Sequence, residues 1–128
     1  MNILAIDYGK KRIGLAWMQE GIDVVLPFGK IQDTNSKIQI EKLVLLVRQE
    51  KIDLLVVGMP IGLDGKENEN TARVREFGAS LAKESGLRVE YIDERFTTSE
   101  AHRMGGDASA DEKSAMLMLE AYHKNKKI

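Results

Sequence analysis

The sequence predicts an α/β fold in which a single mixed sheet is flanked by helices. Three apolar runs come first, separated only by short polar links, which is typical of an antiparallel meander. Two further apolar runs follow, separated by segments with helical periodicity, which is typical of parallel strands joined by crossovers. We therefore expect a five-stranded sheet, made of a three-strand antiparallel meander plus two parallel strands.

The first two strands are expected from residues 3–6 and 13–17. Neither run alternates apolar with polar residues, which indicates strands that are covered on both faces. Gly9 and a basic link between the runs suggest a hairpin turn. The second run is broken only by Gly14. Asp7 then lies at the carboxyl end of a central strand, where sheets with helical crossovers place their ligand crevice.

A third strand should start at Val24 and extend as far as Ile31, with Pro27 marking an edge or a bulge. A helix follows over residues 36–50. Ser36 and Gln39 have the spacing of a capping box. The helix should bury one apolar stripe, since the following positions lie at i, i+3, i+4 and i+7: Ile40, Leu43, Val44 and Val47.

The next apolar run, residues 53–58, predicts a buried strand. The loop over residues 59–65 contains a proline and two glycines, which permit a close backbone approach. A second helix is predicted over residues 67–85 and should end at Gly86. Its expected inward-facing residues are Val74, Phe77 and Leu81. Residues 87–92 then predict the fifth strand.

Two helices complete the chain. A short one should begin near Thr97, which could form a capping box, and stop at Gly105. The last helix should open at Ser109 with Glu112 as its capping partner, and run through Tyr122.

Composition restricts the function. The chain has 128 residues, of which 43% are hydrophobic and none is cysteine. That length suits one domain over 1–128. The lack of cysteine removes disulfides, thiolate metal sites and cysteine nucleophiles, and it fits a reducing compartment. Without a membrane-length apolar run or a signal-peptide pattern, we expect a cytoplasmic protein with no membrane partner. The formal charge of −1 does not by itself indicate a nucleic-acid binder.

Acidic residues from three separate elements are candidates for one site. Asp93 and Glu94 end the fifth strand as Asp7 ends the first. Neighbouring strand residues point to opposite faces, so only one of the pair should reach Asp7. Asp111 lies at the amino end of the apolar face of the last helix. Each acid also has an ordinary structural explanation, since Asp7 could simply cap a turn and Asp111 could complement the helix dipole.

Carboxylates without a nearby His or Cys form a hard-oxygen site, which suits Mg²⁺ or Mn²⁺ better than zinc. A pair of such ions can hydrolyse a phosphodiester. Lys10, Arg12 and Arg95 could neutralise phosphates beside this site. The two histidines, His102 and His123, are expected to be surface or packing residues.

The chain resembles the YqgF/RuvX family of RNase-H-like nucleases, which are relatives of Holliday-junction resolvases. The resemblance covers nearly the whole chain in order. It rests on four segments: Ala5-Ile6-Asp7-Tyr8-Gly9 with Arg12-Ile13-Gly14-Leu15-Ala16; Val57-Gly58-Met59-Pro60 with Asp64-Gly65; Asp93-Glu94-Arg95-Phe96-Thr97-Thr98-Ser99-Glu100-Ala101; and Asp111 with Ser114-Ala115.

This resemblance implies an RNase-H-like fold, a Mg²⁺ or Mn²⁺ site and a nuclease that matures the 5′ end of the precursor of 16S ribosomal RNA. By position in the motifs, the catalytic and metal-binding acids would be Asp7, Glu94 and Asp111. The expected substrate contacts are Lys10, Arg12, Arg95 and Thr97. In one respect the chain departs from the family: residues 105–110 are short and contain no Lys or Arg, where relatives carry a longer basic segment.

Other functions remain open on the sequence. A resolvase of branched DNA would use the same acids on a different substrate. A ribosome-assembly module could keep the fold and bind nucleic acid without hydrolysis. An actin-like ATP-binding protein would need two such domains, and an aspartyl phosphatase would need a second Asp where Gly9 stands. We expect a monomer or a weak homodimer.

Overall fold

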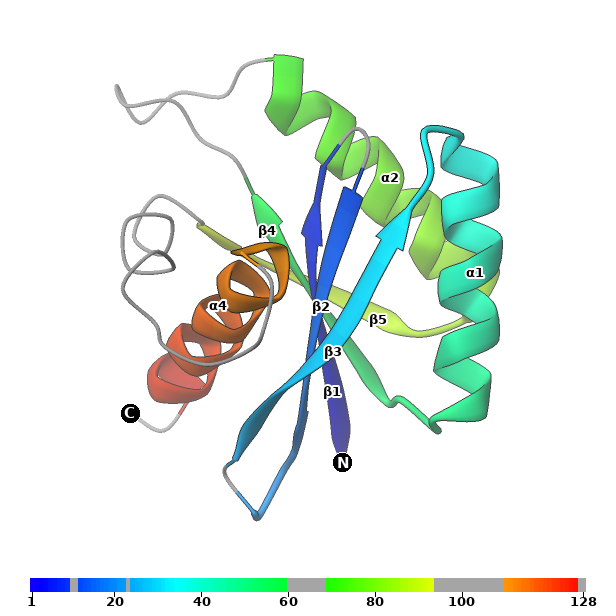
Figure 1. Ribbon diagram of the computed structural model, residues 1–128. Coiled ribbons are helices and arrows are strands. Elements are labelled where there is room, and N and C mark those ends of the chain that lie inside the picture. The colour runs from blue at the N-terminus through cyan, green and yellow to red at the C-terminus, as the bar shows by residue number, and fades with distance from the viewer. Residues whose placement is uncertain (10–11, 23, 60–68, 94–109, 127–128) are drawn as a thin grey trace.

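Five strands form one mixed sheet in the order β3-β2-β1-β4-β5, which confirms the predicted fold class (Figure 1). This computed structural model describes residues 1–9, 12–22, 24–59, 69–93 and 110–126. The short helix predicted from Thr97 lies outside these residues. The strands are β1 (Asn2–Tyr8), β2 (Arg12–Gln19), β3 (Val25–Gln32), β4 (Leu54–Met59) and β5 (Arg88–Asp93), and the helices are α1 (Ser36–Gln49), α2 (Glu69–Ser85) and α4 (Ala110–Lys126).

The central strand is β1, which pairs antiparallel with β2 and parallel with β4. Leu4 and Ile6 face one layer of helices, and Ile3 and Ala5 face the other; all four side chains are fully buried or nearly so. Burial on both faces explains why this strand shows no polar alternation in the sequence.

Strand β3 lies at one edge of the sheet, as Pro27 predicted. Pro27 pairs with Ala16, and Gly29 pairs with Leu15, so the ladder is irregular between these two positions. A proline has no backbone N–H to donate to a ladder and is therefore tolerated at an edge or a bulge.

Helix α1 starts at Ser36, as predicted, but its cap differs from the prediction. The residue before it, Asn35, is the N-cap, and its side chain accepts a 3.2 Å hydrogen bond from the backbone N–H of Ile38. Ser36 is already inside the helix, so the predicted capping box of Ser36 and Gln39 is wrong. The side-chain amide of Gln39 instead donates a hydrogen bond to the backbone carbonyl of Asp33. Gln39 is buried, so this bond gives its amide nitrogen the partner that a buried polar group needs.

Helix α2 follows the prediction closely. Val74, Phe77 and Leu81 are buried, and the chain leaves the helix at Gly86. Gly86 has φ +73°, and its N–H donates to the carbonyl of Ala82 at 2.9 Å. This left-handed conformation favours glycine and ends the helix.

The sheet separates two apolar layers (Figure 1). One layer lies under α1 and α2 and includes Leu43 and Val47 from α1. The other lies under α4, which contributes Ala115 and Leu119. The predicted inward face of α4 is therefore confirmed. Within the described ranges, no helix has the length and apolar character needed to cross a membrane.

Candidate active site

Asp7 lies near the carboxyl end of β1, on the face of the sheet that α4 covers. Side chains alternate along a strand, so Asp7 shares a face with Ile3 and Ala5, which both pack in the α4 layer. The carboxylate is half-buried and takes part in interactions within the protein. The predicted place of Asp7 in the fold, near the carboxyl end of a central strand, is therefore confirmed.

Gly14 connects Asp7 to the last helix. It lies directly opposite Asp7 in the antiparallel pair of β1 and β2. A Cβ atom at Gly14 would collide with the backbone carbonyl of Asp111 and would lie 2.9 Å from its Cβ. The first turn of α4 can rest on β2 only because this residue has no side chain. Asp7 and Asp111 are thus brought to the same glycine from elements far apart in the sequence.

Arg12 forms an ion pair with Asp111, with 3.4 Å between its Nε and Oδ2 of the carboxylate. The Arg12 side chain is 59% exposed and that of Asp111 28%. An ion pair this open to solvent contributes little to stability. The ion pair does show that the Asp111 carboxylate lies close to a positive charge.

Glu112 fastens the same turn of α4 to β3. Its Oε2 accepts a 2.8 Å hydrogen bond from the backbone N–H of Gly29. Gly29 has φ +101° and lies beside the irregularity of the β2–β3 ladder. The sequence predicted a capping box of Glu112 with Ser109, and Ser109 lies outside the described residues. The bond to β3 was not predicted.

The carboxyl ends of the parallel strands lie at the same edge. Ile6 pairs with Val57, and Gly58 pairs with Ile92, so Asp7 lies level with the end of β5. Asp93 is the last residue of that strand. Along β5, Glu90 bonds to Tyr122 of α4, whereas Tyr91 lies against Gly78 of α2.

A polar hollow of about 710 Å³ adjoins Arg12. Its other lining residues come from the end of β3 and the turn after it: Gln32, Asp33 and Thr34. The hollow therefore lies between Arg12, which pairs with Asp111, and the end of the edge strand β3.

The structure describes only part of the predicted site. Asp7, Arg12 and Asp111 lie together, whereas Glu94, Lys10, Arg95 and Thr97 fall outside the described residues. Among the residues that are described, no group of three His, Asp or Glu side chains could hold a metal ion. His123 is half-buried on α4 and interacts within the protein, as expected of a packing residue.

A family model described as "RuvX: Holliday junction resolvase" matches residues 1–125. The chain belongs to the RuvX family. Similar relatives bear the name "Putative pre-16S rRNA nuclease". The one from Aeromonas salmonicida is 38% identical, with 94% of this chain and 93% of the relative covered. The one from Alcanivorax borkumensis is 32% identical with the same coverage.

Solved structures of resolvases share the fold of this RuvX member. RuvC of T. thermophilus, in complex with a Holliday junction substrate, has a TM-score of 0.67 at 12% identity, with 98% of this chain and 96% of RuvC covered. The fowlpox virus Holliday junction resolvase has a TM-score of 0.64 at 11% identity, with 98% and 99% covered. These likenesses confirm the RuvC-like, RNase-H-like fold that the sequence predicted.

Proposed function

We propose that this RuvX member is a divalent-metal-dependent endonuclease that processes the 5′ end of precursor 16S ribosomal RNA in the cytoplasm, with residues 1–128 acting as one nuclease domain. One observation carries the proposal: Gly14 lets the first turn of α4 bring Asp111 to Asp7 at the carboxyl edge of the sheet. The names of the relatives support the RNA substrate.

Glu94 is the third acid in this proposal. Glu90 bonds to α4 and Ile92 packs in the α4 layer, so even-numbered positions of β5 belong to the face that carries Asp7. Because side chains alternate along a strand, this pattern favours Glu94 over Asp93 as the acid that joins Asp7 in our proposal. The register supports the same assignment, because Asp7 is level with Ile92.

The donor set fits Mg²⁺ or Mn²⁺. Asp7, Glu94 and Asp111 offer carboxylate oxygens, and the guanidinium 3.4 Å from Asp111 indicates that positive charge is tolerated there. The three acids would hold a pair of such ions, which would supply an activated water and positive charge for hydrolysis of a phosphodiester. Arg12 would then turn from Asp111 to a phosphate, and Lys10, Arg95 and Thr97 would hold the adjoining backbone.

The test compares single variants on a precursor RNA that contains the 5′ cleavage region. Asp7→Asn, Glu94→Gln and Asp111→Asn should each lower Mn²⁺-dependent cleavage by at least about a hundredfold, since even indirect partners of a bound metal cost 10–100-fold. Asp93→Asn and Glu120→Gln should cleave normally. Glu120 is exposed on the same helix as Asp111 and so serves as the matched control.

Three outcomes would contradict the proposal. Undiminished cleavage by Asp7→Asn would remove the mechanism. Loss of activity in Asp93→Asn but not in Glu94→Gln would reverse the assignment of the third acid. Binding of the RNA without cleavage by the wild-type chain would favour a ribosome-assembly module. A four-way DNA junction is the second substrate to assay, because the RuvC complex shares this fold and holds such a junction.

A further inference from the structure

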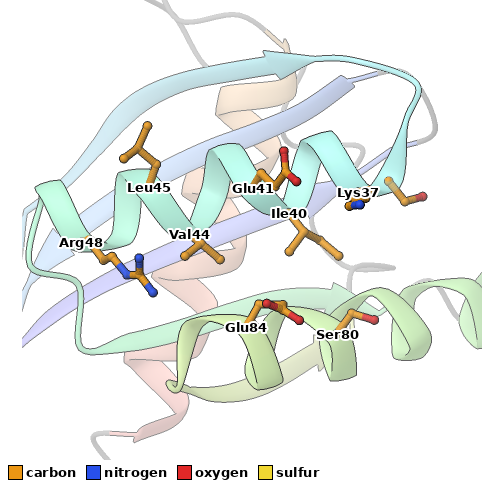
Figure 2. Close-up of a pocket in the computed structure, with 9 residues that line it drawn as sticks. Lys37, Ile40, Glu41, Val44, Leu45, Arg48, Ser80 and Glu84 are labelled. Carbon is orange, nitrogen blue, oxygen red and sulfur yellow. The ribbon is translucent and has the colours of Figure 1, made fainter.

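A groove of about 760 Å³ lies between α1 and α2, on the face of the sheet opposite α4 (Figure 2). Ile40 and Val44 form its apolar part, and both point from α1 toward α2 in the figure. Leu45 also lines it and is 58% exposed. Val44, which is half-buried, and the exposed Leu45 together make an apolar strip on α1.

On α1, one charged residue lies on each side of this strip, and Lys37 and Glu84 also line the groove. Glu41 lies three positions before Val44, and Arg48 lies three positions after Leu45. These four positions have the i, i+3, i+4, i+7 spacing of one helix face. Neither Glu41 nor Arg48 forms an ion pair with any residue in the described part of the chain. This face of α1 thus carries, in order, an acidic residue, two apolar residues and a basic residue: Glu41, Val44, Leu45 and Arg48.

We propose that a second copy of this chain docks on this strip, with the two α1 helices antiparallel about a twofold axis between Val44 and Leu45. Reversing a helix about that point exchanges positions 41 and 48. Glu41 of each copy would then lie opposite Arg48 of the other, giving two ion pairs around a centre of four apolar side chains.

The pattern selects this partner because a twofold interface requires one patch to be complementary to itself. In a parallel arrangement, Glu41 would face Glu41 and Arg48 would face Arg48, which is unfavourable. The contact is confined to the strip and the adjoining α2 residues, so it is smaller than the roughly 1,600 Å² of a standard stable interface. We therefore expect a weak dimer.

The dimer would leave the candidate active sites open. Helix α1 and helix α4 cover opposite faces of the sheet (Figure 1). Joining two copies through α1 therefore directs both α4 faces outward, away from the interface. This inference does not depend on the proposed nuclease function.

Sedimentation velocity of the full chain over a range from about ten to several hundred micromolar tests the proposal. The wild type should shift from monomer to dimer as its concentration rises, and high salt should weaken the dimer. Glu41→Arg would place Arg opposite Arg, and Arg48→Glu would place Glu opposite Glu. Each single variant should therefore stay monomeric at concentrations where the wild type dimerises.

A charge exchange makes the test specific. An equimolar mixture of the two single variants should form a heterodimer, and the double variant Glu41→Arg/Arg48→Glu should regain self-association. Glu120→Arg, which makes the same charge change on α4, should dimerise like the wild type. A wild type that remains monomeric throughout, single variants that dimerise normally, or a mixture that fails to associate would each overturn the proposal.

Discussion

Gly14 lies opposite Asp7 in the sheet and directly under the first turn of α4. Any side chain at this position would meet the backbone of Asp111. We expect Gly14→Ala to push the first turn of α4 away from β2. A displacement of about 1 Å can cost on the order of a hundredfold in rate. Overpacking should also lower the free energy of unfolding by about 1–3 kcal/mol. Cleavage kinetics and urea unfolding measure the two effects.

Gly78→Ala is the matched control for this glycine. A Cβ atom there would meet the hydroxyl end of Tyr91, on the opposite face of the sheet. Tyr91 is 41% exposed, so its ring can move outward at small cost. This variant should cleave RNA normally, and normal cleavage by Gly14→Ala as well would disprove the dependence of the site on this contact.

At the residue scale, the sequence predicted where Asp7 and Asp111 lie in their elements, but not the contacts around them. Asp7 and Asp111 follow from local signals, namely a strand end and a helical face. The contact at Gly14 was not predicted, although a glycine inside an apolar strand is itself a signal of close backbone approach. The ion pair of Arg12 with Asp111 depends on folding and has no local signal.

At the scale of elements, α4 is fastened to the sheet at both ends. Near its start, Glu112 accepts the backbone N–H of Gly29 in β3. Glu112→Ala should free that N–H and loosen the turn that carries Asp111, so we expect cleavage to fall by about tenfold. Hydrogen exchange of the Gly29 amide should become faster. A purely global loss of stability would instead speed exchange throughout the core.

The conservative variant distinguishes these cases. Glu112→Gln keeps a carbonyl oxygen that can accept from Gly29, so it should restore most of the cleavage and the amide protection. Glu120→Ala, on the exposed side of the same helix, should change neither. Equal losses in the Ala and Gln variants would contradict a positioning role for the hydrogen bond.

Near its end, α4 is held to β5 by a hydrogen bond from the hydroxyl of Tyr122 to Glu90. Burial, followed by this bond and the charge of Glu90, raises the pKa of Tyr122 to about 12. A pKa raised in the folded state means that the folded protein binds the proton more tightly. The stabilisation is therefore complete below pH 10 and is lost as the pH rises toward 12.

We expect Tyr122→Phe to cost about 1 kcal/mol of unfolding free energy at neutral pH. It should also flatten the decline in stability between pH 10 and 12. Urea unfolding of wild type and variant at pH 8, 10 and 11.5 measures both effects. A wild type whose excess stability over the variant does not shrink across that range would refute the linkage.

Element boundaries show where sequence patterns stop being sufficient. The end of α2 at Gly86 was predicted because only a left-handed residue closes that turn. The start of α1 at Ser36 was predicted, but its cap was not, because Asn35 and Ser36 are both good capping residues and the local pattern does not distinguish them. Glu112 had a plausible local partner in the sequence, whereas its bond to Gly29 joins residues brought together by the fold.

On the scale of the whole molecule, the two faces of the sheet carry different candidate surfaces. The α4 face carries the carboxylates, and the opposite face carries the strip on α1. The order of elements was enough to predict this mixed sheet, because meanders and crossovers constrain which strands can neighbour each other. It could not predict the surface of α1, since the same residues that form its predicted apolar stripe also line the groove.

If the acids form one hard-cation site, binding there should stabilise the entire fold. At a Mn²⁺ concentration ten times the dissociation constant, linkage supplies about 1.4 kcal/mol, or roughly 4–7 °C in Tm for a chain of this size. Asp7→Asn and Asp111→Asn should lose most of that shift, and Glu120→Gln should keep it. Calorimetry with and without Mn²⁺ separates binding from cleavage. A shift in Asp7→Asn equal to that of the wild type would mean that the ion binds elsewhere, because a carboxylate that holds the metal in the folded state cannot be replaced by an amide without weakening the linkage.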